Sequence, residues 1–184
     1  MFETERIKLR RWTLEDAGDM YAYATNPNVG PNAGWNVHQS IEESKQVIQM
    51  FLQGDEWAIV DKVTNRVIGS VGIMKDFRRR YEGSYFIGYV LAEEYWGKGI
   101  MTEAVKTMIP YVFETLHASI LSVGHFTRNN RSRRVIEKCG FVYEGTYRRG
   151  YFAQTGDIHD DANYSMLDTE YKKLKEEGFF LVKM

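Results

Sequence analysis

The residues whose types and spacing best suit chemistry form the stretch "YWGKGIMTEA", which runs from Tyr95 to Ala104. Gly97 and Gly99 flank Lys98 where helix-forming residues begin, although glycine inside a helix costs about 1 kcal/mol relative to alanine. The first turn of a helix exposes unpaired backbone N–H groups and carries partial positive charge. Because glycines let a bulky anion approach that backbone, the stretch predicts a phosphate-binding turn, to which Lys98 could add a charge.

Two common phosphate motifs do not fit this stretch. A Walker loop needs Ser or Thr after its lysine, whereas Gly99 follows Lys98, and it needs a glycine where Ala92 stands. The dinucleotide fingerprint needs a third glycine at the position of Thr102. On this stretch alone, a plain turn between a strand and a helix, without a ligand, stays open.

A second polar group lies about thirty residues further on, in "NNRSRRVIEKCGF". Asn129 and Ser132 are one turn apart at the predicted start of a helix that Gly140 ends. Asn and Ser are common helix caps, so capping alone would explain them. A role at a ligand is the alternative.

Composition excludes several function classes. The chain has 184 residues, 43% hydrophobic and 27% charged, and a net charge of −1, so we expect one domain, residues 1–184, without a broad basic field for nucleic acid or membrane. Its single cysteine, Cys139, cannot form an internal disulfide or a multi-cysteine zinc site. The four histidines show no ligand spacing, so we predict no metal. Short apolar runs and an amino terminus without an apolar h-region predict no membrane span, no secretory signal and a cytoplasmic location.

The elements that must position these residues follow from the pattern of the chain. Alternation predicts a strand in "RIKLRRW", and Ser or Thr caps predict helices in "TLEDAGDMYAYA" and "SIEESKQVIQMFLQG", separated by a Pro/Gly/Asn-rich loop. We then expect a hairpin turning near residues 64–65, a strand over 84–91, and a helix from the glycine turn to about Leu116. A strand "ILSVGHF", the helix after Asn129 and two closing strands complete a mixed α/β domain.

Together, "YWGKGIMTEA", "NNRSRRVIEKCGF" and "YEGTYRRGYF" resemble, in this order, the GNAT N-acetyltransferase superfamily. "TERIKLRRWTLEDA" and "YSML" resemble its RimJ/RimL-type branch of ribosomal-protein N-terminal acetyltransferases. The resemblance implies an α/β (α+β) GNAT fold, with a mostly antiparallel twisted sheet of about seven strands flanked by about four helices. It also implies acetyl-CoA as cofactor and acetyl transfer to a primary amine, most simply a peptide amino terminus.

The resemblance also implies roles for particular residues. The pyrophosphate of CoA would bind the backbone amides of Trp96, Gly97, Lys98, Gly99, Ile100, Met101 and Thr102. The pantetheine arm would bind backbone groups of Tyr89, Val90 and Leu91. Its thiol end would lie beside Asn129 and Ser132, and Lys138 would contact the adenosine phosphates. Arg133 is a second candidate there. Both Lys138 and Arg133 could equally be solvated helix charges, and for Arg133 this is the favoured interpretation.

In the implied mechanism a neutral amine attacks the thioester directly. A strand amide near Leu91 would donate a hydrogen bond to the carbonyl oxygen of the thioester. Ser132 would protonate the leaving sulfur, and Asn129 is predicted to belong to the same catalytic group. The family's common tyrosine acid and glutamate base are replaced by Ile136 and Phe86. The candidate bases left open are Glu82, Glu144, His125, His159 and Asp160.

The acceptor amine would approach through the loops at 26–38 and 77–83. We predict substrate-binding roles for Trp35, Tyr81, His125 and Asp160. Tyr151 is a further candidate for this wall. Without the glutamate base, an α-amine is favoured over a lysine amine, because its pKa of about 7.7–8.0 leaves more of it neutral. The alternative functions are acetyl transfer to a small-molecule amine such as a polyamine or aminoglycoside, a non-catalytic acyl-CoA sensor, and a nucleotide-binding protein. An exposed closing strand could also pair with a second copy of the chain in a homodimer.

Overall fold

The computed structural model describes residues 1–181, which form one eight-stranded sheet with the order β1-β2-β3-β4-β5-β6-β8-β7. All neighbouring strands are antiparallel except β5 and β6, which are parallel. The predicted mixed sheet is therefore confirmed. The strands are β1 (Phe2–Glu3), β2 (Ile7–Arg11), β3 (Asp55–Asp61), β4 (Val67–Lys75), β5 (Ser84–Leu91), β6 (Ile120–Phe126), β7 (Val142–Phe152) and β8 (Ile158–Leu167).

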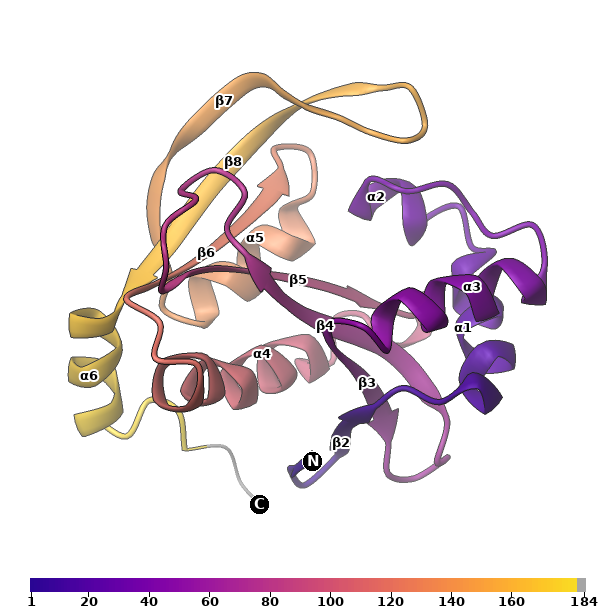
Figure 1. The fold of residues 1–184 in the computed structure, drawn as a ribbon, viewed down its shortest axis with the longest axis horizontal. Helices are drawn as coiled ribbons and strands as arrows, with labels where there is room; N and C mark the ends of the chain where they lie inside the picture. The colour runs from indigo at the N-terminus through magenta and orange to yellow at the C-terminus, as the bar shows by residue number, and fades with distance from the viewer. Residues whose placement is uncertain (182–184) are drawn as a thin grey trace.

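Helices cover both faces of the sheet, because its central strands bury side chains on both sides. In β3, Trp57 and Ile59 pack into the cluster that holds α4, α5 and α6, whereas Ala58 and Val60 pack into the cluster that holds α1 and α3. Figure 1 shows α4 and α6 apart from α1 and α3. The helices are α1 (Ala17–Ala24), α2 (Gly30–Ala33), α3 (Ile41–Phe51), α4 (Ile100–Pro110), α5 (Asn130–Lys138) and α6 (Asp168–Glu176).

The helix ends follow the capping chemistry of the sequence. Ser40 caps α3 by accepting a hydrogen bond from the backbone N–H of Glu43 at 3.1 Å, as predicted. Asp16 accepts from the backbone N–H of Thr13 at 2.9 Å, which forms the predicted capping box, and Arg10 binds the same carboxylate at 2.7 Å.

The structure adds elements that the sequence pattern missed. The segment predicted to be loop contains the single-turn helix α2, which Pro31 at its first turn favours. Helix α6 follows β8 directly, and the two-residue strand β1 adds an edge to the sheet. Helix α4 ends at Pro110 and continues as a π-helix over Tyr111–Thr115, which confirms the predicted helical segment to about Leu116. Over residues 1–181, no helix combines the length and apolar character that crossing a membrane requires.

Candidate functional site

The sheet opens between its two parallel strands. Their pairing extends only from Ser84 with Ile120 to Phe86 with Ser122, and beyond it β5 and β6 diverge (Figure 1). The backbone N–H of Ala92 donates to the carbonyl of Ile68, so it points toward β4. Because successive residues of an antiparallel strand point their N–H and C=O groups to opposite sides, those of Tyr89 and Leu91 point away from β4. Those groups face the opening, where the carbonyl of Leu91 accepts the indole N–H of Trp96 at 2.8 Å, whereas Val90 is bonded into the β4 ladder.

A cavity of about 530 Å³ occupies this opening. Its walls come from β5, the glycine turn and the start of α4, the carboxyl end of β6, one face of α5, and α2. Nearly all the residues predicted to bind the cofactor line it, namely Tyr89, Val90, Leu91, Trp96, Gly97, Gly99, Ile100, Met101, Thr102, Asn129, Ser132 and Lys138. Lys98 does not line the cavity, and its ammonium lies 5.3 Å from the centre of the Tyr95 ring.

The glycine turn takes a backbone shape that suits glycine. Gly97 and Gly99 have φ values of 74° and 77°, and Gly99 is the residue that precedes α4. The amino-terminal strand region fixes this turn, because Arg6 donates to the carbonyl of Lys98 at 2.7 Å and to the carboxylate of Glu103 at 2.7 Å. Sequence reasoning missed Arg6, because nothing in its own segment indicates a partner 92 residues away.

One face of α5 turns three positive charges toward the cavity: Arg131, Arg134 and Lys138. Their spacing, i, i+3 and i+7, places them along one side of the helix. Arg131 also stacks on Trp96, with its guanidinium carbon 4.1 Å from the ring centre. Arg133 lies on another face and pairs with Glu137 at 2.8 Å, as a solvated helix charge would. The helical spacing was the signal that could have identified Arg131 and Arg134.

A hydroxyl pair lies where β5 faces α5. The hydroxyl oxygens of Tyr89 and Ser132 are 2.8 Å apart, and the side-chain oxygen of Asn129 accepts the backbone N–H of Ser132 at 3.2 Å. Asn129 also donates to the carbonyl of Asn32 at 3.4 Å, which ties α5 to α2. Burial raises the pKa of Tyr89, so its phenol is protonated. Sequence reasoning assigned Tyr89 only a backbone role.

Two carboxylates in β8 face opposite ways, and the one predicted to bind substrate is outside the cavity. Asp160 is exposed and accepts the backbone N–H of Arg149 at 2.7 Å. Its neighbour Asp161 is buried, lines the cavity and pairs with Arg78. Successive side chains of a strand alternate between faces, so the acid that lines the cavity is one residue after the predicted one. Burial raises the pKa of Asp161, although the guanidinium of Arg78 opposes this shift.

The other predicted acceptor residues divide between the cavity and its surroundings. His125 lines the cavity, with Nδ1 2.8 Å from the carbonyl of Phe126 and Nε2 3.4 Å from the Tyr164 hydroxyl. Trp35 instead packs on His38, and Tyr81 is exposed in the turn after β4, so neither lines the cavity.

Phe86 and Ile136, which replace the expected base and acid, are placed differently in the structure. Phe86 lines the cavity, whereas Ile136 is buried in the core beneath α5. Tyr151 also lines the cavity, as expected. Of the remaining candidate bases, Glu82 is exposed, Glu144 is paired with Arg79, and His159 packs on Phe126.

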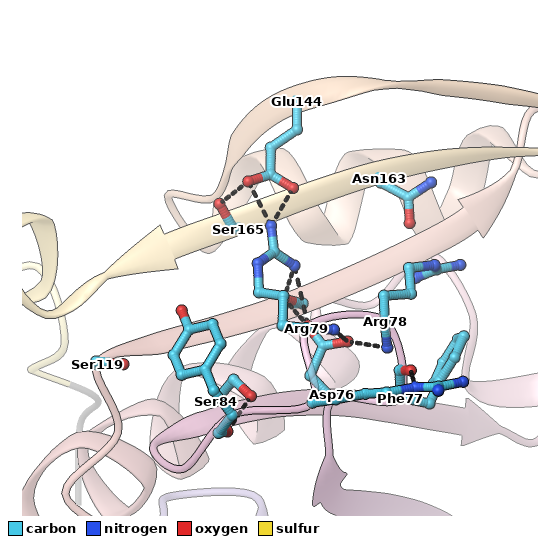
Figure 2. Close-up of polar contacts among 12 residues, drawn as sticks. Asp76, Phe77, Arg78, Arg79, Ser84, Ser119, Glu144, Asn163 and Ser165 are labelled. Atoms are coloured by element: carbon cyan, nitrogen blue, oxygen red, sulfur yellow. Dashed lines mark hydrogen bonds and ion pairs between the residues drawn. The ribbon is translucent and has the colours of Figure 1, made fainter.

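A buried polar network supports the wall beside Arg78 (Figure 2). Asp76 is fully buried and binds Ser122 at 2.7 Å and Arg79 at 2.9 Å. Arg79 reaches across to Glu144 at 2.6 Å, and Glu144 accepts from Ser165 at 2.8 Å. The network therefore joins the turn after β4 to β6, β7 and β8, while Arg78 turns away from it toward the cavity.

The part of the chain that the structure describes offers no cluster of side chains that could bind a metal ion. Within residues 1–181, no group of three or more His, Cys, Asp or Glu side chains is placed to hold a metal ion. Cys139 is buried, and burial raises the pKa of its thiol to about 12, so it is unreactive at neutral pH.

Known proteins share both the sequence and the fold. A family model described as an acetyltransferase (GNAT) domain matches residues 6–142. YoaA, an uncharacterized N-acetyltransferase of Bacillus subtilis (strain 168), is 32% identical over 175 residues, which cover 91% of this chain and 96% of that protein. The ribosomal protein uS5-alanine N-acetyltransferase of Escherichia coli (strain K12) is 27% identical over 104 residues, 56% of this chain and 53% of that one. The crystal structure of a GNAT-family acetyltransferase from Bacillus anthracis shares the fold with a TM-score of 0.83 and 22% identity, over 91% of this chain and 98% of that one.

Proposed function

This chain belongs to the GNAT family of acetyltransferases, and from that premise we propose that it transfers the acetyl group of acetyl-CoA to the α-amine of a peptide or protein amino terminus, as a RimJ/RimL-type enzyme. The opened sheet is the observation that carries the proposal. The cavity between β5 and β6 runs from a glycine turn that suits a pyrophosphate to a wall that bears Asp161 and His125. The uS5-alanine N-acetyltransferase among the relatives supports a peptide acceptor.

The residues around the opening fit acetyl-CoA. Gly97 and Gly99 leave the backbone at the start of α4 open to a pyrophosphate, and Arg131, Arg134 and Lys138 supply positive charge nearby. Tyr89 and Leu91 turn backbone groups toward the space that an amide-containing arm would fill. When bound, the substrate supplies an acetyl thioester that an amine can attack.

The chain's own groups serve the transfer in distinct ways. The amine nitrogen bonds to the acetyl carbon, the carbon–sulfur bond breaks, the nitrogen loses a proton and the sulfur gains one. The N–H of Leu91 faces the opening and can donate to the acetyl oxygen. Ser132 is proposed to protonate the sulfur, and Tyr89, 2.8 Å from it, is a positioning residue for that hydroxyl.

Asp161 and His125 are the groups in the cavity wall that can accept the proton of the amine. Burial raises the pKa of Asp161, which makes its carboxylate a stronger base than an ordinary aspartate. An α-amine, with a pKa of about 7.7–8.0, needs far less help than a lysine amine with a pKa near 10.4. This difference favours an α-amine acceptor at a site without a glutamate at Phe86.

An acceptor screen tests the proposed function. Peptides with free amino termini, peptides with a free lysine, polyamines and aminoglycosides are incubated with acetyl-CoA, and free CoA thiol is measured. We expect the amino-terminal peptides to give the highest kcat/KM. Ser132→Ala is expected to lower kcat by about 100-fold or more while acetyl-CoA still binds.

Ser119→Ala, an exposed serine before β6, is the matched control and should retain full activity. Tight acetyl-CoA binding without thiol release from any amine would instead favour the acyl-CoA sensor. A clear preference for polyamines or aminoglycosides would overturn the peptide acceptor.

A further inference from the structure

An ion pair forms part of the cavity wall where an acceptor would enter. Arg78, from the turn after β4, binds Asp161 of β8, and the exposed fractions of the two side chains are 20% and 5%. Aromatic rings surround the guanidinium carbon, at 4.5 Å from the centre of Phe77 and 5.8 Å from those of Phe86 and Tyr147. Both charged side chains line the cavity itself, so a ligand can reach the pair.

Oxygen acceptors gather on the other side of Asp161, around Gly124. A Cβ at Gly124 would stand 3.0 Å from Oδ1 of Asp161, 3.3 Å from the carbonyl oxygen of Ala162 and 3.5 Å from Oδ1 of Asn163. Oδ1 of Asn163 is buried and has no hydrogen-bond partner among residues 1–181, and the amide nitrogen of the same side chain donates to the carbonyl of Asp161. A side chain at this position would crowd the carboxylate of Asp161, so glycine keeps the cavity open beside that carboxylate.

An ammonium group suits the part of the cavity beside Asp161. It carries three N–H donors and a positive charge, which match the carboxylate of Asp161 in the cavity wall. An ammonium bound there would compete with Arg78 for the carboxylate. Arg78 would then lose the partner that neutralises it, and a partly buried charge without a partner is unfavourable.

An anion on the acceptor would restore that partner. We infer that the acceptor carries a carboxylate within a few bonds of its α-amine, so that the amine binds Asp161 while the carboxylate takes the fork of Arg78. The carboxylate is either that of a free amino acid or the side chain of an amino-terminal aspartate or glutamate. The inference rests on the proposed function, and it disfavours polyamines because their second ammonium would lie near Arg78.

Matched acceptor pairs test this inference. One pair is two peptides that differ only in Asp or Asn as the first residue, and the other is phenylalanine and its amide. In at least one pair the carboxylate member should have a kcat/KM about 10- to 100-fold higher, as expected for a hydrogen-bonded charge. The pair that shows the preference identifies the source of the carboxylate. Binding of each acceptor in the presence of CoA is measured by calorimetry as a readout that needs no chemistry.

Substitutions assign the preference to the ion pair. Arg78→Gln should reduce the ratio within each pair to about one, and Arg78→Lys should retain only part of it because the guanidinium fork is lost. Asp161→Asn should weaken both members of a pair. Arg148→Gln, which removes an exposed charge from β7, is the control and should keep the wild-type ratio.

The outcomes separate this inference from the proposed function. Equal kcat/KM and equal binding within both pairs, or a preference that survives in Arg78→Gln, would overturn the inference. Thiol release from no acceptor, with the carboxylate preference still present in binding, would overturn the proposed activity and support the site. If Arg78→Gln does not fold, the double variant Arg78→Gln/Asp161→Asn removes both charges together and should also give a ratio of about one.

Discussion

Gly99 connects local backbone shape to ligand binding. Its φ of 77° lies in the left-handed region, where a residue with a branched Cβ is strained by about 1–3 kcal/mol. A side chain there would also project near the guanidinium of Arg6, because a Cβ at this position would stand 3.6 Å from Nη2 of that residue. The backbone at the start of α4 is open because Gly99 has no side chain.

Gly99→Val is therefore expected to weaken acetyl-CoA binding by at least about tenfold, a loss of about 1.4 kcal/mol, while the fold is kept. Titration calorimetry measures the affinity, and thermal unfolding measures the stability. Gly156→Val is the matched control, because Gly156 has a φ of 88° and open space around it but lies in the β7–β8 turn. Unchanged affinity in Gly99→Val would mean that the segment is only a turn.

Single residues also show where sequence reasoning stops. The glycine spacing and the polar helix start predicted most of the residues that border the cavity at the glycine turn, and also Asn129 and Ser132, but not Arg131 and Arg134. Whether Asp160 or Asp161 faces the cavity could not be decided from the sequence, because the direction of a strand's side chains depends on its register with partners far along the chain. In β8 that register pairs Asp161 with Phe126 and with Tyr147.

At the scale of elements, the turn after β4 depends on polar side chains of neighbouring strands. Asp76 directly follows β4, and its side chain is bonded to Ser122 of β6 and to Arg79, which in turn pairs with Glu144 of β7 (Figure 2). Burial alone would raise the pKa of Asp76, but hydrogen bonds from Ser122 and Arg79 outweigh it and hold the pKa below its ordinary value. Arg78, between them in sequence, is positioned by the same turn.

Asp76→Asn should lower the free energy of unfolding by about 3–5 kcal/mol, because Arg79 loses a fully buried partner. It should also raise the KM for the acceptor, since the turn that carries Arg78 loses its anchor. Urea unfolding and steady-state kinetics measure the two effects. Glu144→Gln, at a side chain that is 37% exposed, is the control and should cost about 1 kcal/mol or less.

The same group sets the direction of a pH effect. The pKa of Asp76 is lower in the folded chain than its unfolded value of about 3.9, so its stabilisation is present above that pH and is lost as the pH falls through the folded pKa. The wild type should therefore lose stability more steeply below about pH 4 than Asp76→Asn does. Parallel acid profiles would contradict this assignment.

Elements were predicted well wherever the periodicity was strong. The strand over 84–91 and the cap of α3 were predicted with their observed bounds, because alternation and capping are local signals. Helix α2 was missed because its four residues, Gly30–Ala33, show no periodicity and their partner Asn129 lies almost a hundred residues away. A contact between residues so far apart in sequence cannot be inferred from the local residue pattern.

For the whole molecule, the division of the sheet between β5 and β6 is what makes a binding site. The cavity is bordered by α2 from the amino-terminal half and by α4, α5 and β6 from the carboxyl-terminal half. A ligand in it therefore contacts both halves and binds the folded chain alone. Binding that is absent from the unfolded chain stabilises the fold by about 2.7 kcal/mol at a ligand concentration of about 100 Kd.

Acetyl-CoA at that concentration is therefore expected to raise the Tm by about 5–10 °C, given a shift of about 2–4 °C per kcal/mol for a domain of this size. Hydrogen exchange should locate the effect. The amides of Tyr89 and Leu91 face the opening and should gain protection, whereas that of Val90 is already bonded to β4 and should change little.

ATP and NAD serve as controls, because they share phosphate groups with CoA but lack the pantetheine arm. They should protect residues near the glycine turn at most, and leave Tyr89 and Leu91 as they are without ligand. If ATP or NAD gave a larger Tm shift than acetyl-CoA, the glycine turn would serve a nucleotide rather than CoA. Equal protection of Val90 and its two neighbours would mean that the ligand tightens the whole sheet and does not pair with the free edge of β5.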